Sequence, residues 1–169
     1  MDLIVFYLFA LIAVLAALGV IGLRNSVHSA LCLALVFVSL AAMYILLNAP
    51  FIAAAQVMIY AGAILILFLF VIMLLSPEME SGIGALKSQR WLAALFGMLL
   101  VVELGIVVGR AAIPGVTGRF SPEVLAQIGD TQAVGGMLFT DFLLPFEITS
   151  MLLLVAVVGV IVLAKKSKT

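Results

Sequence analysis

The sequence predicts an all-α integral membrane protein with five transmembrane helices. Hydrophobic residues make up 67% of the chain and charged residues only 9%, whereas soluble domains carry about 25% charged residues. Five apolar stretches also reach the roughly 20 residues that a helix needs to cross a bilayer. We therefore expect a single transmembrane domain over residues 1–169, with spans near 3–23, 27–47, 51–75, 91–108 and 146–164.

The first two spans are bounded by a charged residue and a proline. Residues 3–23 end before Arg24, and residues 27–47 end before Pro50, which cannot continue a helix. The first stretch begins with Asp2 rather than a basic cluster and is too long for the apolar core of a signal peptide. We therefore expect it to be a transmembrane helix rather than a cleaved leader.

The third span, residues 51–75, has no charge yet carries side chains that a lipid anchor would not need. Gln56 and Tyr60 lie four residues apart and would share one face of an α-helix. Gly62 lies between two alanines, and bulky Ile, Leu and Phe residues fill the second half. This asymmetry predicts a helix buried among other helices, with Gln56, Tyr60 and Gly62 as its candidate functional residues.

The fourth span, residues 91–108, contains an intramembrane carboxylate. Glu103 lies near its middle, where a charged side chain costs about 2.5–3.5 kcal/mol on insertion scales and usually faces protein or water. Two roles remain open, a proton relay and a protonated carboxyl that hydrogen-bonds to a neighbouring helix. Gly105 and Gly109 favour close contact with such a helix.

The fifth span, residues 146–164, follows Pro145 and precedes a basic C-terminus. Glu147 is expected in its first turn, where a carboxylate complements the positive end of the helix dipole. An electrostatic cap and a proton relay are the two roles that this position allows.

The distribution of Lys and Arg residues predicts the orientation in the membrane. Six of them lie on the side of the first loop, the third loop and the C-terminus, and two lie on the other side. The positive-inside rule then places the C-terminus in the cytoplasm and the N-terminus outside. Residues 111–144 form a long outer loop, in which Ser121 and Pro122 could open a short helix.

Few side chains in the sequence are suited to catalysis or metal binding. His28 is the only histidine and Cys32 the only cysteine, so the chain can form neither a histidine cluster nor a cysteine-based metal centre. We interpret His28 as an interfacial polar residue and Cys32 as a small packing residue. The net charge of zero argues against a nucleic-acid partner. We do not expect the chain to be an enzyme by itself.

Three stretches, taken in order, resemble one family of membrane proteins. They are RNSVHSAL at 24–31, AAAQVMIYAGAILILFLFVIMLL at 53–75 and FEITSMLLLVA at 146–156. They are similar to the J subunit of proton-pumping NADH:quinone oxidoreductase (respiratory complex I), whose mitochondrial counterpart is NADH dehydrogenase subunit six. The sequence departs from that pattern at Ser26, where the family commonly has proline.

The resemblance implies a multi-pass subunit of the bacterial inner membrane that has no redox centre of its own. FMN, iron–sulfur clusters and quinone would then belong to other subunits, and the partners would be membrane-arm subunits of the A, H, K and N types. The resemblance also implies a π-bulge near Tyr60 and Gly62 that forms and relaxes, opening a hydrated proton route. A glycine with small neighbours lowers the cost of that rearrangement.

Three alternative functions remain open at this point. The chain could belong to a ferredoxin-linked or other donor-linked relative, or to a cation antiporter complex. It could also be a small secondary transporter, although such proteins usually show inverted repeats and this sequence shows no convincing self-similarity.

Overall fold

The computed structural model describes residues 2–75, 87–110 and 120–165. Within these ranges the chain forms helices and no strands. Five helices are long and apolar enough to cross a membrane, which confirms the predicted all-α class and the number of spans. The expected loop at 76–86, the start of the outer loop and the basic residues beyond 165 lie outside the described residues.

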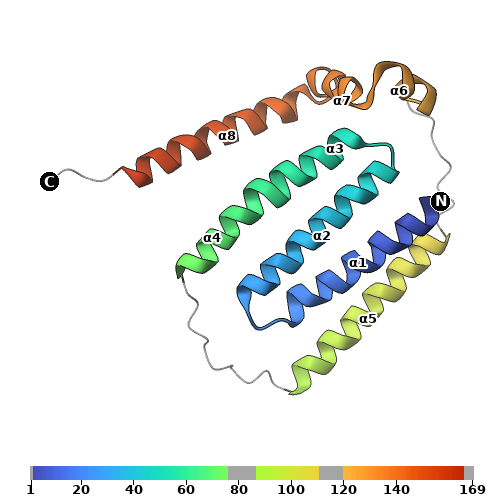
Figure 1. The fold of residues 1–169 in the computed structure, drawn as a ribbon, viewed down its shortest axis with the longest axis vertical. Helices are drawn as coiled ribbons and strands as arrows, with labels where there is room; N and C mark the ends of the chain where they lie inside the picture. Colours follow the sequence, from blue (N-terminus) through green and yellow to red (C-terminus); the bar gives the residue numbers. More distant parts are fainter. Residues whose placement is uncertain (1, 76–86, 111–119, 166–169) are drawn as a thin grey trace.

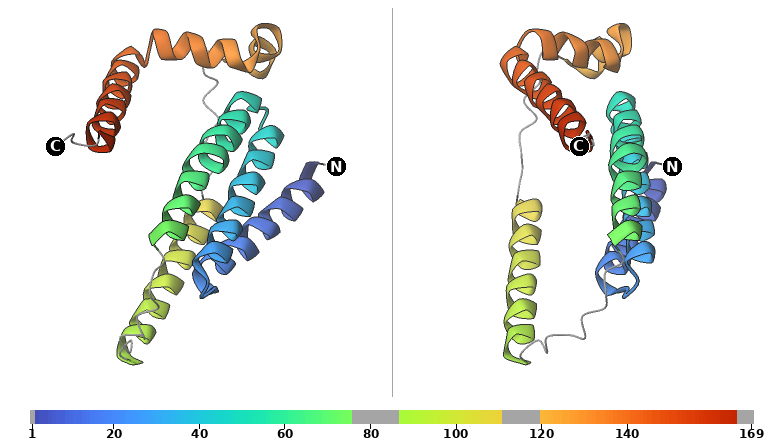
Figure 2. Two further views of the ribbon diagram at one scale, coloured as in Figure 1. Left: turned by 60° about the vertical axis from the view of Figure 1, so that its left-hand side comes forward. Right: turned by 90° about the vertical axis from the view of Figure 1, so that its left-hand side faces the viewer.

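The first three spans lie side by side in one layer (Figures 1 and 2). The second span occupies the middle of the layer and contacts both of its neighbours. The third span changes its helical form twice along its length. The elements are α1 (Asp2–Gly22), α2 (Ser26–Leu46) and, in the third span, α3 (Pro50–Ala55), the π-helix η1 (Gln56–Ile64) and α4 (Leu65–Leu75).

Small side chains allow α1 and α2 to approach closely. Ala16 on α1 and Ala30 on α2 are buried. A Cβ atom added at Gly19 would lie 2.9 Å from Sγ of Cys32, so a larger residue there would require α1 or the Cys32 side chain to shift. Spans in lipid gain their contact energy mainly from such close packing. The interpretation of Cys32 as a small packing residue agrees with this geometry.

Polar residues in the first turn between spans hold α1 and α2 as a hairpin. Asn25 precedes α2 and accepts hydrogen bonds from the backbone N–H groups of Val27, at 2.9 Å, and His28, at 3.3 Å. The Ser29 hydroxyl donates to the Val20 carbonyl oxygen of α1. Donors at the start of a helix have no partner within the helix, so this cap stabilises the start of α2.

A second tight turn leads from α2 into the third span. Asn48 adopts φ 57°, a left-handed conformation that asparagine tolerates better than most residues. The N–H of Asn48 donates to the Ile45 carbonyl oxygen at 3.0 Å, and the N–H of Ala49 donates to that of Tyr44 at 3.0 Å. This pair of bonds is the Schellman arrangement, and it fixes the direction in which α3 begins.

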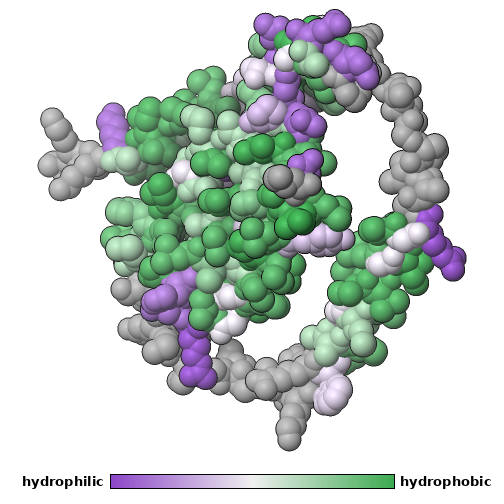
Figure 3. Space-filling view, turned by 45° about the vertical axis from the view of Figure 1, so that its right-hand side comes forward, coloured by the Kyte–Doolittle hydropathy of each residue, from purple (hydrophilic) through white to green (hydrophobic). Residues whose placement is uncertain are grey.

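The fourth and fifth spans stand apart from this layer (Figure 2). Among the described residues, α5 (Lys87–Arg110) contacts no other helix, and α8 (Leu143–Ala164) contacts only α7 (Asp130–Phe139). On the face seen in Figure 3 the spans are largely hydrophobic, and hydrophilic residues gather near helix ends and over the described part of the outer loop. Most of the apolar surface of α5 and α8 is therefore open to lipid or to other protein.

Two short helices of the outer loop connect the fifth span to the layer. The first, α6 (Pro122–Ile128), begins after Ser121, whose hydroxyl accepts a hydrogen bond from the Val124 N–H at 3.5 Å. This confirms the short helix predicted to open there. The second, α7, contacts α3, α6 and α8. It thus places part of the outer loop against the beginning of the third span.

Candidate functional site

The third span departs from α-helical geometry where the sequence carries its candidate functional residues. Residues Gln56–Ile64 form a π-helix between two α-helical segments. At its end the Leu65 N–H donates to the Tyr60 carbonyl oxygen, five residues back rather than four. π-Helices are rare, occur mostly as single turns and are frequent at functional sites. The π-bulge that the family resemblance implied is therefore present in this structure.

Gly62 lies inside the π-helical segment. A Cβ atom added there would lie 3.2 Å from the backbone oxygen of Val57, tighter than an ordinary van der Waals contact. A larger side chain would therefore require the backbone of η1 to shift slightly. In an α-helix the same position would favour alanine over glycine by roughly 0.5–1 kcal/mol. Gly62 thus lowers the stability of the α form and leaves room in the π form.

Gln56 and Tyr60 occupy different environments, although an α-helical spacing would place them together. The side chain of Gln56 is 8% exposed, whereas that of Tyr60 is 48% exposed. The Tyr60 ring meets the Phe37 ring of α2 edge to face, with centroids 5.6 Å apart. The two side chains therefore have different surroundings in this structure, although both belong to η1.

The third span is buried on one side only within this chain. Ala53, Gln56 and Leu65 are buried, whereas Met58 and Leu67 are exposed. Among the described residues, α2 and α7 cover the span on this side, and the prediction of a helix buried among other helices stays a prediction for its other face. The remaining face is free to meet lipid or another subunit.

Another polar side chain is buried in the middle of the layer. Ser39 of α2 is 1% exposed, and its hydroxyl donates to the Leu35 carbonyl oxygen at 2.8 Å. Such a bond within a helix satisfies the hydroxyl without a partner from a neighbouring helix. Ser39 is therefore a small buried residue of α2 whose hydroxyl has a hydrogen-bond partner within its own helix.

The structure places Glu103 in the middle of α5 with its side chain exposed. A Cβ atom added at either Gly105 or Gly109 would meet nothing within 4 Å. The close helix contact predicted at this glycine pair is thus not made by the described parts of the chain. The two roles considered for Glu103 both stay predictions.

The position of Glu147 differs from the prediction. Helix α8 begins at Leu143, so Glu147 lies in its second turn, and the first turn contains no acidic residue. Pro145 lies within that first turn, where proline is tolerated because the N–H it lacks would have no partner within the helix. The helix dipole acts mainly on the terminal turn, so the electrostatic-cap role is wrong. Since α5 and α8 do not contact each other among the described residues, Glu103 and Glu147 are not brought together.

His28 and Cys32 were considered as possible metal ligands. Across the described ranges there is no group of three or more His, Cys, Asp or Glu side chains that could hold a metal ion. His28 is exposed at the first turn of α2, as expected for an interfacial polar residue.

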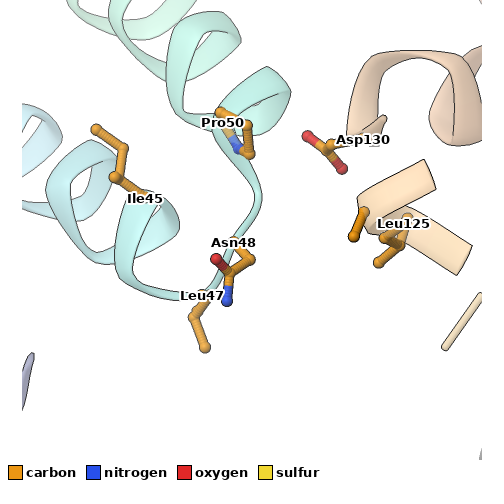
Figure 4. Close-up of a pocket in the computed structure, with 7 residues that line it drawn as sticks. Ile45, Leu47, Asn48, Pro50, Leu125 and Asp130 are labelled. Atoms are coloured by element: carbon orange, nitrogen blue, oxygen red, sulfur yellow. The ribbon is translucent and has the colours of Figure 1, made fainter. Parts of the chain in front are cut away.

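Asp130 was not singled out by sequence, yet it makes a long-range contact with the third span. Its Oδ2 atom accepts a hydrogen bond from the backbone N–H of Phe51 at 2.9 Å, across 79 positions of sequence. Figure 4 shows its carboxylate directed toward the start of α3 beside Pro50. A cavity of about 620 Å³ separates the α2–α3 turn from the outer loop at this corner, with Leu47 and Leu125 among its lining residues. Two features of the sequence could have indicated this contact. Ala49 cannot cap the helix that follows it, and the outer loop contains an acidic residue, Asp130, that can.

Comparison with known proteins gives one consistent family. A family described as NADH-ubiquinone/plastoquinone oxidoreductase chain 6 matches residues 16–163. The NAD(P)H-quinone oxidoreductase subunit 6 of the Paulinella chromatophora organellar chromatophore is 44% identical over 98% of this chain and 78% of the relative. The NADH-quinone oxidoreductase subunit J of Rickettsia conorii is 36% identical over 98% of this chain and 81% of the relative. The NAD(P)H-quinone oxidoreductase chain 6 of a Synechocystis species is 40% identical over 95% of this chain and 79% of the relative.

Proposed function

Because this chain belongs to the NADH-ubiquinone/plastoquinone oxidoreductase chain 6 family, and is thus a subunit of such an oxidoreductase complex, we propose that it helps to couple quinone reduction to proton translocation. The coupling element is the third span, and the observation that carries the proposal is its π-helical segment, Gln56–Ile64. Membership of this family also favours the complex subunit over a small secondary transporter.

The third span changes between the observed π form and an α-helical form. Each residue of an α-helix turns the chain by about 100°, so removing the extra residue from one wide turn rotates one part of the span by roughly that angle. Two conformations are both populated only when their free energies differ by no more than a few kcal/mol. Gly62 supports this balance, because it destabilises the α form and avoids a close contact with the Val57 oxygen in the π form.

Rotation of α4 exchanges the side chains that this helix presents to a neighbouring subunit. Its exposed face carries bulky groups, including Leu67, Phe68 and Phe70. Phe68 and Ile72 also line a cavity of about 350 Å³ beside Arg24, which leaves room for these side chains to move. Turning the bulky face away opens a hydrated route for protons between the quinone-proximal and antiporter-like subunits, and turning it back closes that route.

The remaining parts of the proposal concern the rest of the complex. A nicotinamide nucleotide is the electron donor, as the names of the relatives state for those proteins. FMN, iron–sulfur clusters and quinone are bound by other subunits. For the clusters, one histidine and one cysteine give this chain too few ligands. The partners are membrane-arm subunits of the A, H, K and N types, in a bacterial cell membrane with the N-terminus outside.

The experiment that tests this function is a Gly62→Val substitution in the intact complex, reconstituted into liposomes. Valine crowds the π-helical turn at the Val57 oxygen, so we expect slower quinone reduction and less proton pumping. Electron transfer from NADH to a water-soluble artificial acceptor should stay near wild type, because that route does not use the membrane arm. The analogous Gly97→Val substitution on α5, where an added Cβ meets nothing within 4 Å, is the matched control. Wild-type pumping and rate in Gly62→Val would contradict the proposed function.

A further inference from the structure

The third span begins without a capping residue of its own. Ala49 is its N-cap residue and offers no side-chain acceptor, and Pro50 at the first helical position has no N–H to donate. The first backbone donor of α3 that needs a partner is therefore Phe51. Helix N-termini are usually satisfied by a Ser, Thr, Asp or Asn immediately before the helix. Here the acceptor comes from Asp130 in the outer loop.

The same carboxylate lies at the beginning of a second helix. Asp130 is the first residue of α7, directly after Gly129. Its negative charge therefore meets the positive ends of two helix dipoles, that of α7 and that of α3, and it favours their close approach. Helices α3 and α7 contact each other at this point. Asp130 is half-buried, which limits its screening by solvent.

Apolar packing secures this corner only in part. The cavity of about 620 Å³ lies between the α2–α3 turn and the outer loop and opens to the surface. The Asp130–Phe51 hydrogen bond links the outer loop directly to the backbone of the third span. The Asp130 carboxylate therefore contributes directly to the attachment of the loop at the start of the third span.

We propose that Asp130 is a positioning residue that fixes the N-terminal end of the third span, so that the change in η1 turns α4 rather than α3. The inference rests on the proposed function of the third span. A helix that gains or loses a wide turn must rotate at one end, and the less restrained end moves. The Schellman turn at Asn48 and the Asp130 bond restrain the start of the span. When the turn and the bond are both formed, α3 stays fixed and α4 rotates, together with its exposed side chains.

The test compares three variants of the intact complex in proteoliposomes. Asp130→Ala removes the acceptor, and Asp130→Asn keeps an oxygen at the same position without the charge. Glu123→Gln is the matched control, since Glu123 is an exposed outer-loop carboxylate that interacts locally. Hydrogen bonds from Ser121 and from its own backbone lower the pKa of Glu123. The measurements are amide hydrogen exchange of a peptide covering 50–55, NADH oxidation with a water-soluble acceptor, and protons pumped per NADH.

We expect Asp130→Ala to speed exchange in residues 50–55 by about fivefold, the usual effect of losing a helix cap. Protons pumped per NADH should fall by a similar factor, while electron transfer to the water-soluble acceptor, which does not use the membrane arm, stays near wild type. Asp130→Asn should restore most of the protection and most of the pumping, and Glu123→Gln should match the wild type in all three measurements.

Contrary results would separate this inference from the function on which it rests. Wild-type exchange in Asp130→Ala, or faster exchange with unchanged pumping, overturns the positioning role. If Gly62→Val lowers pumping in that same case, the proposed function of the third span stands. If neither Gly62→Val nor Asp130→Ala alters pumping, the proposed function falls and the inference falls with it.

Discussion

At the residue scale, the polar side chains of the spans differ in the groups that surround them. Tyr60 packs its ring on Phe37, Gln56 is buried, and Ser39 satisfies its hydroxyl within its own helix. Glu103 differs from these residues, because it is exposed on a helix that contacts no other described helix. A carboxylate exposed to hydrocarbon would be costly, so we expect a neighbouring subunit or water to cover Glu103 in the complex.

A Glu103→Gln substitution tests whether that carboxylate carries protons. Glutamine keeps the size and hydrogen-bonding capacity of the side chain but cannot titrate. If Glu103 is a relay, protons pumped per NADH should fall well below the wild-type value, while electron transfer to a water-soluble acceptor remains. Glu147→Gln, measured in parallel, reports the same for the second carboxylate. Full pumping in Glu103→Gln would show that this residue only forms packing or hydrogen-bond contacts.

A second prediction at this scale concerns the two parts of the Tyr60 side chain. Tyr60→Phe removes the hydroxyl and keeps the ring on Phe37, whereas Tyr60→Leu removes the aromatic pair, which is worth about 0.5–1.5 kcal/mol. If the ring locks η1 against α2, quinone-linked turnover stays near wild type in Tyr60→Phe and falls by about two- to tenfold in Tyr60→Leu. The opposite ranking would identify the hydroxyl as the functional group.

At the scale of elements, the third span combines three segments with different surroundings. Its start, α3, is held by the α2–α3 turn and by Asp130. Its middle, η1, packs on α2, and its end, α4, combines one buried leucine at Leu65 with a bulky exposed face. Both ends of the span contact α2, but only its start also has the Asp130 bond, so a local change of helix type can be turned into rotation of α4. This arrangement accounts for a coupling role without a reactive side chain in the span.

Sequence reasoning located the spans well, because apolar length and breakers such as Pro50 depend only on local chemistry. It misplaced the start of α8, since Pro145 was treated as a boundary although proline fits within a first turn. It grouped Gln56 with Tyr60, whereas the structure buries Gln56 and leaves Tyr60 half-exposed, because only the tertiary packing decides which of the two is covered. The Asp130–Phe51 contact could not be derived, because it depends on how the outer loop folds back over the membrane layer.

At the scale of the whole molecule, the chain forms one compact layer with two outlying spans. Helices α5 and α8 expose apolar side chains along their length, and the described part of the chain offers them no helical partner within the membrane. A single-chain function would leave these surfaces to lipid alone. A subunit of a larger complex can instead place them between neighbours, which agrees with the family to which the chain belongs.

The proposed orientation can be checked with cysteines introduced at the two ends of the chain, in a Cys32→Ala background. A membrane-impermeant thiol reagent added to intact cells should label Asp2→Cys and leave Lys168→Cys unlabelled, because the positive-inside rule places the basic end in the cytoplasm. Inverted membrane vesicles should give the reverse pattern. Labelling of Lys168→Cys alone in intact cells would show that the orientation is wrong.

The central claim is that the third span exchanges between a π and an α form while the enzyme works. Its most direct measurement is electron cryomicroscopy of the complete complex, at rest and during turnover with NADH and quinone. We predict two classes of particles, one with the π-helix at Gln56–Ile64 and one with a continuous α-helix whose α4 segment is rotated by about 100°. The start of the span at Phe51 should keep its bond to Asp130 in both classes. The same π-helix with α4 unrotated in every class under turnover would contradict the account.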